Sequence, residues 1–357
     1  DGATPRPDRA RHGAATAGRV MSTKINVSVV GASGYAGGEL VRLLAGHPDV
    51  SIASLHARGR SGTPLADEFP HLAPLGLALT DGEPGDVDVI FLALPAGGSA
   101  VLAARRAQAG TTVIDVGADL RLHDPAAYPT WYGFEHPAPN ALADAVYGLT
   151  ELAGDKLRGA KLIANPGCYP TAALLALAPF AEHLTGQAIV DAKSGISGAG
   201  RGAGRDYLFT ELDGATKAYG LGGHRHSAEI EQELAGAGAR IGLTFVPHLV
   251  PQSRGILATC YVELRDDLSD DELRSLLADR YARAPFVHVV DAPPSTKQTW
   301  GTNHAFVHAR RSGERRAVLL SVIDNMGKGA AGQAIQNMNV ALGLDETAGL
   351  GAVAVYP

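Results

Sequence analysis

Apolar residues in the first half of the chain form short, continuous runs separated by glycine-rich turns and by segments of helical periodicity. The first run, Ile25–Val30, leads into a turn that starts at Gly31, and Glu39–Gly46 then repeats apolar residues at helical spacing. The later runs are typical of parallel strands buried on both faces, with Ser99–Ala109 as a helical crossover. These runs are Val50–Leu55, Val87–Leu94 and Thr111–Val116. The pattern predicts an α/β domain.

The pattern changes in the second half, where longer strands alternate with glycine-rich loops. Two helices are predicted there, near Ala228–Leu234 and over Ser269–Ala284. The predicted strands are Ala188–Ala192, Leu243–Leu249, Ile256–Leu264 and Ala317–Ile323. This order favours an α+β domain on an antiparallel or mixed sheet. A last helix, Gly332–Leu342, is expected to pack back on the first domain.

We therefore expect two domains, as the length of 357 residues also suggests. Residues 21–167 would form the first, completed by 327–357, and residues 168–326 the second. The polar stretch 1–20 lacks the apolar centre of a signal peptide and is interpreted as a disordered leader or an upstream-start artefact, with Met21 as the native start. A transit peptide is the less favoured alternative for it.

Composition excludes several classes of function. The net charge of −6 argues against nucleic-acid binding, which needs a basic face. No run approaches 18 uninterrupted apolar residues, so no membrane span is predicted. Two cysteines cannot make a disulfide framework, and they suit the reducing cytoplasm.

The turn after the first strand has the spacing Gly31-x-x-Gly34-x-x-Gly37 and lies between a strand and a helix. Such a turn lets the backbone approach a pyrophosphate at a helix N-terminus, so we expect a dinucleotide site there. The second strand is followed by Arg58, Arg60 and Ser61 in place of the acidic residue of an NAD site. These residues predict NADP(H), the alternative being a solvated basic loop.

Cys168 stands at the start of an apolar helix, in the stretch Asn165–Thr171 with Pro170 in the first turn. Helix N-termini favour negative charge, so this setting predicts a thiol of lowered pKa and a nucleophilic role. Such a nucleophile needs a proton-transfer partner, and His224 or His226 could supply it. A metal site is not predicted, because the His-x-His pair has no third ligand at zinc-type spacing.

Several polar residues are candidates for binding an anionic substrate or the cofactor. Gly/Ser loops with a trailing arginine, and residues that end parallel strands, can cradle small anions, although the former can equally be flexible surface loops. The candidates are Arg121, Ser194, Ser197, Arg201, Asn325 and Lys328.

The chain resembles the N-acetyl-gamma-glutamyl-phosphate reductases, a family of the semialdehyde dehydrogenase superfamily. The resemblance runs from Met21 to the C-terminus in family order. It is carried by GASGYAGGEL (31–40), GADLRL (117–122), NPGCYPTAALLAL (165–177), SGISGAGR (194–201), HRHSAEI (224–230), PQSRGILAT (251–259) and DNMGKGAAGQAIQNMN (324–339).

The resemblance implies a Rossmann-type NADP-binding domain, a catalytic α+β domain and the NADPH-dependent third step of arginine biosynthesis. It implies Cys168 as nucleophile, His226 as general acid/base, His224 as a neighbour in the substrate site and Tyr219 as a residue that closes over the cofactor. It also implies a homotetramer. The expected cofactor contacts are Gly31, Ser33, Gly34, Tyr35, Ala36, Gly37, Arg58, Ser61, Tyr219, Asn325 and Lys328.

Three alternatives remain open at this point. Aspartate-semialdehyde and glycolytic-type phosphorylating dehydrogenases share the cysteine chemistry, but the NPGCYPT context does not resemble theirs. The sequence distinguishes poorly between the N-acetyl-gamma-glutamyl-phosphate reductases and the aminoadipyl-phosphate reductase of lysine biosynthesis, which acts on a carrier-linked substrate. A non-catalytic NADP-binding protein could use the same fold. Cys260 is expected to be a core residue without a chemical role.

Overall fold

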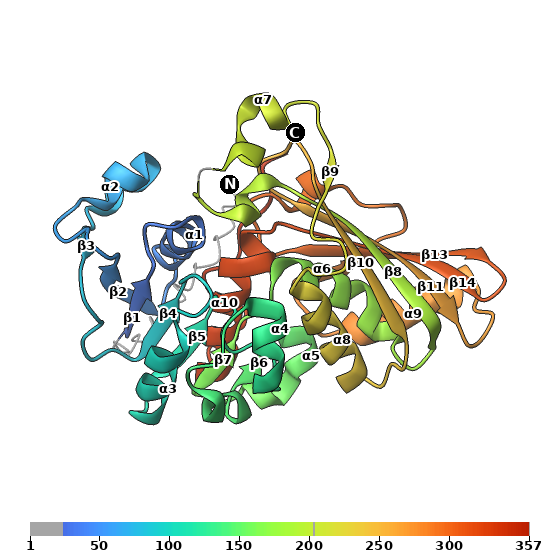
Figure 1. Ribbon diagram of the computed structural model, residues 1–357, viewed down its shortest axis with the longest axis horizontal. Coiled ribbons are helices and arrows are strands. Elements are labelled where there is room, and N and C mark those ends of the chain that lie inside the picture. The colour runs from blue at the N-terminus through green and yellow to red at the C-terminus, as the bar shows by residue number, and fades with distance from the viewer. Residues whose placement is uncertain (1–23, 203, 357) are drawn as a thin grey trace, which may run out of the picture.

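The computed structural model describes residues 24–202 and 204–356; the predicted leader, residues 1–20, lies outside this range. Two seven-stranded sheets organise the described chain, one in each half (Figure 1). Within the described residues, no helix is long and apolar enough to span a lipid bilayer.

The first sheet is parallel throughout, in the order β3-β2-β1-β4-β5-β7-β6. Its strands are β1 (Ile25–Val30), β2 (Val50–His56), β3 (Leu79–Thr80), β4 (Val89–Leu92), β5 (Thr112–Asp115), β6 (Val146–Tyr147) and β7 (Leu162–Ala164). The main helices between them are α1 (Tyr35–Leu44) and α3 (Ala100–Gln108). Three very short helices, α2 (Leu65–Glu68), α4 (Tyr128–Tyr132) and α5 (Thr150–Ala153), lie in its connections.

The second sheet is mixed, in the order β12-β13-β14-β11-β8-β10-β9, and confirms the predicted fold class. The β8 and β10 strands pair in parallel, whereas β11 pairs antiparallel with both β8 and β14. Its strands are β8 (Leu184–Ser194), β9 (Lys217–Ala218), β10 (Gly242–Leu249), β11 (Ile256–Leu264), β12 (Val287–Val289), β13 (Ala305–Gly313) and β14 (Arg316–Ile323).

One buried helix forms the centre of the second domain. The α6 helix (Cys168–Leu177) packs against β11 and β14, and every residue of it after Cys168 is buried. It is apolar on all sides, as expected of a helix that has no face in contact with solvent. The remaining helices here are α7 (Phe209–Leu212), α8 (His226–Gly236) and α9 (Asp270–Tyr281). Cys168, the predicted nucleophile, is therefore held by the core of this domain.

Local sequence explains where two of the predicted helices begin and end. The predicted helix from Ser269 begins at Asp270, because Ser269 is its N-cap and forms a capping box with Glu272. The C-terminal helix α10 (Gly332–Leu342) ends at Gly343, which adopts the left-handed conformation. This helix packs against α1 and β5 of the first sheet.

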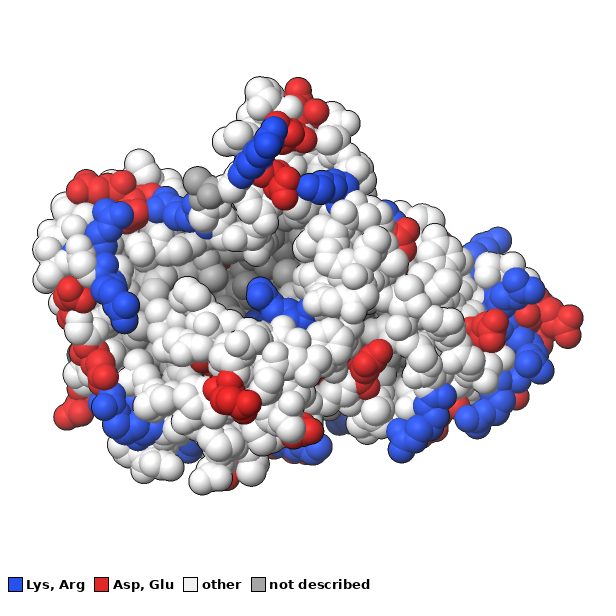
Figure 2. Space-filling model, viewed as in Figure 1, with Lys and Arg blue, Asp and Glu red and all other residues white. Residues whose placement is uncertain are grey.

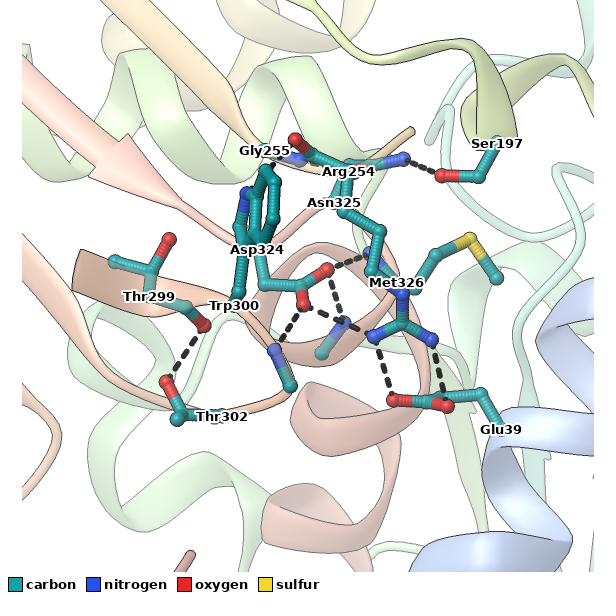
Figure 3. A network of polar contacts seen from close by, with 12 residues as sticks. Glu39, Ser197, Arg254, Gly255, Thr299, Trp300, Thr302, Asp324, Asn325 and Met326 are labelled. Atoms are coloured by element: carbon teal, nitrogen blue, oxygen red, sulfur yellow. Dashed lines mark hydrogen bonds and ion pairs between the residues drawn. The ribbon is translucent and has the colours of Figure 1, made fainter. Parts of the chain in front are cut away.

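The two domains are joined by a partly buried network of charges around Arg254, in the loop between β10 and β11 (Figure 3). Its guanidinium donates to both carboxylate oxygens of Glu39 on α1, at 2.9 and 2.7 Å, and to Asp324 at the end of β14, at 3.0 Å. Asp324 also accepts hydrogen bonds from the backbone N–H groups of Gly301 and Met326. The network therefore joins the first helix of one domain to two strand ends of the other.

Glu39 is 5% exposed, and its pKa is lowered to about 2. Burial by itself would raise the pKa, but hydrogen bonds and charge from Arg42 and Arg254 outweigh it. Because this pKa lies below the ordinary value of 4.5, ionised Glu39 stabilises the folded protein. This stabilisation is complete above about pH 4.5 and is lost as the pH falls toward 2.

We expect Glu39→Gln to lower the free energy of unfolding at pH 7 by about 2–4 kcal/mol, since Arg254 and Arg42 lose a buried partner. The difference from wild type should shrink as the pH falls below about 4.5. Urea unfolding at pH 7, 5, 4 and 3 measures this, with exposed Glu211→Gln as the matched control. A pH-independent difference would contradict the assigned cause.

Candidate functional site

A cavity of about 1030 Å³ lies between the two domains and joins the predicted dinucleotide loop to Cys168. Figure 2 shows a hollow between the domains, with basic side chains at its floor and both signs of charge along its rim. Most of the predicted site residues line the cavity. They are Gly31, Ser33, Gly34, Tyr35, Ala36, Gly37, Arg58, Arg121, Cys168, Ser197, Arg201, His226 and Asn325.

The glycine loop forms the cradle that a dinucleotide requires. Gly31 has a φ of +86°, and a Cβ there would lie 2.2 Å from the carbonyl oxygen of Ala93. A Cβ on Gly37 would lie 2.2 Å from the carbonyl oxygen of Gly31, so the first turn of α1 sits directly on the loop. Gly34 is the N-cap and provides no side-chain cap. The helix N-terminus therefore keeps N–H groups for a phosphate, and the residues fit NADP(H).

Cys168 is the first residue of α6 and packs tightly against Gly329, and both residues line the cavity. A Cβ on Gly329 would lie 2.8 Å from the Cβ of Cys168. Gly329 belongs to a single turn of π-helix, Gly327–Ala331, and its N–H donates to the carbonyl oxygen of Asp324 at 2.9 Å. Such turns interrupt regular helices frequently at functional sites. The turn thus links Asp324 of the domain-joining network to Cys168.

Two further predicted site residues, His226 and Arg121, lie against Gly167, the residue before Cys168. The φ of −66° at Gly167 suits any residue, so space and not backbone freedom requires glycine here. A Cβ would lie 2.5 Å from Nε2 of His226 and 2.8 Å from Nη1 of Arg121. The imidazole and the guanidinium therefore rest on the backbone immediately before Cys168.

Arg121 is buried and spans the junction of the domains. Its Nε donates to the carbonyl oxygen of Asn165 at 2.9 Å, and Nη2 donates to that of Val116 at 3.0 Å. Nη1 lies 3.6 Å from Oε2 of Glu229 on α8. Although burial opposes the positive charge, the Glu229 carboxylate keeps the pKa of Arg121 above its ordinary value.

Glu229 is a site residue that the sequence analysis did not assign. It is 0% exposed and accepts hydrogen bonds from the backbone N–H of Gly167 and from the hydroxyl of Tyr147, both at 2.7 Å. Its place three residues after His226 on α8 was the available signal, because that spacing sets both near one face of a helix. It holds the loop before Cys168 and balances the charge of Arg121.

The protonation states of Cys168 and His226 are set mainly by desolvation on burial. Burial raises the pKa of the Cys168 thiol to about 11, although the Arg121 charge lowers it. The expectation of a lowered thiol pKa at the helix N-terminus is therefore wrong for the free protein, since desolvation is the larger effect. Burial, with His224 and Arg121 nearby, holds the pKa of His226 well below its ordinary value. The resting pair is a thiol and a neutral imidazole.

The neutral imidazole has a defined tautomer. Nε2 of His226 lies 3.4 Å from Nη1 of Arg121, which can only donate a hydrogen bond. Nε2 is therefore the basic nitrogen, and Nδ1 carries the proton. Nε2 is also the atom nearest to a Cβ built on Gly167, so it lies beside the backbone that precedes Cys168.

His224 lies behind His226 and does not line the cavity. Its Nδ1 accepts the backbone N–H of His226 at 3.2 Å, at the start of α8. Its ring packs edge-on against Tyr169, Tyr219 and Phe245, and burial lowers its pKa to about 4. In this structure it supports the position of His226.

Five predicted residues lie outside the cavity lining: Ser61, Ser194, Tyr219, His224 and Lys328. Lys328 is 0% exposed and donates to Glu151 and Gln336, both at 2.6 Å, so the prediction that it contacts the cofactor is wrong in this structure. The hydroxyl of Ser194 donates to the carbonyl oxygen of Gly195, and Tyr219 donates to Tyr169.

Arg201 lines the cavity but is held by the first domain. It pairs with Glu68 at 2.5 Å and donates to the carbonyl oxygen of Ser33 in the glycine loop at 3.3 Å. Its guanidinium lies over the ring of Phe69, 4.4 Å from the centroid. It is therefore placed nearer the cofactor loop than its predicted role in substrate binding implied.

The described residues contain no cluster of three or more His, Cys, Asp or Glu side chains that could hold a metal ion. The fold and the cavity define a class: a two-domain dehydrogenase in which a cysteine and a histidine face a dinucleotide loop. Family models agree. The one described as the NAD binding domain of semialdehyde dehydrogenase matches residues 26–160, and the one for the dimerisation domain matches residues 168–325.

Solved structures show the same fold. Aspartate semialdehyde dehydrogenase II from Vibrio cholerae, complexed with ASA, aligns with a TM-score of 0.67 and 19% identity over 89% of this chain and 98% of that one. The aspartate semialdehyde dehydrogenase from Candida albicans, with NADP, aligns with a TM-score of 0.63, 16% identity and the same coverage.

Curated relatives identify the family within this class. The N-acetyl-gamma-glutamyl-phosphate reductase of Dehalococcoides mccartyi is 47% identical over 339 residues, covering 94% of this chain and 99% of the relative. That of Brevibacillus brevis is 48% identical over 347 residues, covering 93% and 100%. The chain belongs to the N-acetyl-gamma-glutamyl-phosphate reductase family, which confirms the resemblance.

The raised thiol pKa gives a prediction for the free protein. The rate of alkylation of Cys168 by iodoacetamide should keep rising from pH 7 to pH 10, because the thiolate fraction grows about tenfold per pH unit below the pKa. Mass spectrometry of the modified peptide measures this. Fully buried Cys260 is the internal control and should stay unmodified while the protein is folded. A plateau below pH 8 would show a thiol of lowered pKa instead.

Proposed function

We propose that this chain catalyses the NADPH-dependent reductive dephosphorylation of N-acetyl-L-glutamyl 5-phosphate to N-acetyl-L-glutamate 5-semialdehyde, the third step of arginine biosynthesis. One observation carries the mechanism: a single cavity is lined by the dinucleotide loop at one end and by Cys168, His226 and Arg121 at the other. The names of the relatives support the choice of substrate.

The reaction begins with proton transfer within the neutral pair. Nε2 of His226 takes the proton of the Cys168 thiol, which makes the sulfur nucleophilic although its resting pKa is high. Sγ then attacks the acyl carbon of the substrate. A C–S bond forms, the bond from carbon to the phosphate oxygen breaks, and His226 returns the proton to the departing phosphate. The product is a thioester on Cys168.

The second half reduces this thioester. When bound, NADPH supplies a hydride to the thioester carbon. The C–S bond then breaks, the semialdehyde leaves, and the Cys168 thiolate regains a proton, so that one proton is consumed in the complete reaction. Arg121 lines the cavity beside Gly167 and is placed to stabilise negative charge that develops at the acyl oxygen or the phosphate.

The proposed activity can be measured in reverse. Protein supplied with NADP⁺, phosphate and N-acetylglutamate semialdehyde should form NADPH only when phosphate is present. His226→Gln should lower kcat by about 10²–10⁴-fold because the general base is lost. Cys168→Ser should lower it at least as much, since the thioester cannot form.

Matched substrates and a control variant separate the alternatives. Cys260→Ala changes the other thiol, which is remote from the cavity lining, and should keep wild-type kcat. A preference for aspartate semialdehyde or a carrier-linked aminoadipate semialdehyde would overturn the substrate. Absence of activity with all three, together with NADPH binding, would favour a non-catalytic binding protein. Full activity of Cys168→Ser would overturn the thioester route.

The proposal extends to a homotetramer in the cytoplasm. Ile189 on β8 and Tyr261 on β11 are neighbours in register and are 42% and 45% exposed, which leaves an apolar pair on the sheet surface. Paired apolar side chains of this kind suit a subunit interface. Tyr261→Glu should reduce the mass measured by light scattering to that of a smaller assembly. An unchanged tetramer would place the interface elsewhere.

A further inference from the structure

The cofactor cavity extends beyond the glycine loop to a third region, of which the sequence analysis considered only the end of the second strand. This region joins the end of β2, the segment that follows β3 and one side of α3. In dinucleotide-binding folds the ribose that carries the 2′ substituent lies near the end of the second strand. The lining residues here include Arg58, Asp81, Glu83 and Arg105.

The end of β2 does not provide the carboxylate that binds a 2′-hydroxyl. Its last residue is His56, which is 5% exposed. Nδ1 of His56 lies 3.0 Å from the carbonyl oxygen of Gly82 and must donate to it, so Nε2 accepts from the hydroxyl of Ser54 at 2.9 Å. Burial lowers the pKa of this histidine, consistent with a neutral ring. His56 is thus a structural support.

Two carboxylates nearby would repel a 2′-phosphate if they were free. Asp81 is committed to the backbone, since it accepts the N–H of Gly59 at 3.1 Å and that of Gly82 at 3.0 Å. It therefore shapes the loop that carries Arg58. Glu83 is different, because its carboxylate is paired with a side chain, the guanidinium of Arg105 on α3.

The ion pair between Glu83 and Arg105 is weak enough for Arg105 to leave Glu83 and bind another anion. Both side chains are 58% exposed, and ion pairs at such positions contribute little to stability. A phosphate monoester carries nearly two negative charges, and arginine can bind it with two parallel hydrogen bonds. A phosphate that enters this end of the cavity is therefore a stronger partner for Arg105 than Glu83 is.

We propose that Arg105 is, with Arg58, the second cation of the 2′-phosphate site, and that it leaves Glu83 for the phosphate when the cofactor binds. Glu83 then acts as a competing anion: it neutralises Arg105 in the free protein, and a cofactor without the 2′-phosphate does not displace it. This assignment rests on the proposed NADP(H) dependence. In this assignment Arg105 takes the role in binding the 2′-phosphate that the sequence analysis predicted for Arg60 and Ser61. Both of those residues lie outside the cavity lining, and Arg60 pairs with Glu68 at 2.9 Å.

Titration calorimetry with two fragments tests the proposal without catalysis. The probes are 2′,5′-ADP and 5′-ADP, which differ in the 2′-phosphate. Arg105→Gln should weaken binding of 2′,5′-ADP by about 10–100-fold, as expected for a charge-assisted pair, and change that of 5′-ADP less than about 2-fold. Arg105→Lys should fall between. Glu83→Gln should strengthen 2′,5′-ADP by about 2–5-fold, because the competitor is lost.

Arg60→Gln is the matched control and should bind both fragments like the wild type. Retained 5′-ADP binding shows that each variant is folded. A wild type that prefers 2′,5′-ADP, together with an unaffected Arg105→Gln, would overturn this inference alone. A wild-type protein that binds the two fragments equally would overturn both this inference and the NADP assignment. The proposed reaction would still stand if the protein were active with the semialdehyde and either cofactor.

Discussion

The buried contact between Arg121 and Glu229 is the constraint on which the rest of the site depends. Arg121 comes from the dinucleotide-binding half and Glu229 from α8 of the second half, so a charge pair crosses the boundary between two separate cores. Neither charge could be buried alone at tolerable cost. Because Glu229 also binds Gly167 N–H, this pair sets the position of the backbone before Cys168.

The same contact explains the chemistry of the resting protein. Desolvation by burial keeps both Cys168 and His226 neutral, with the thiol protonated and Nε2 unprotonated. A thiol that becomes a thiolate only when its proton is transferred to a neighbouring base is protected from oxidants in solution, because the thiolate is the reactive form. Arg121 provides the nearby positive charge that favours the thiolate during the reaction.

A second network, around Arg254, also joins the two domains. Asp324 connects it to the π-helical turn whose Gly329 rests on Cys168, while Asn325 donates to Ser197 on the cavity wall (Figure 3). The cavity is thus held between two sets of ionic contacts that cross the domain boundary. The geometry of the cysteine depends on both.

Sequence by itself determined the local features: the strand, glycine loop and helix at 25–44, and the helix that begins at Cys168. These follow from periodicity, glycine positions and helix-end chemistry, which act over a few residues. Short strands such as β3 and β6 were not predicted, since a strand of two residues has no periodic pattern. β13 was also not predicted, and its second half is polar and exposed.

Only the tertiary structure decided which candidate side chains reach the cavity and in which protonation state. Lys328 and Arg121 both follow strand ends, yet Lys328 points into a buried pair with Glu151 and Arg121 faces the cavity. The raised thiol pKa likewise reverses what the helix N-terminus suggested. The physical reason is the same in each case: side-chain direction and desolvation depend on groups that are distant in sequence and are brought together only by packing.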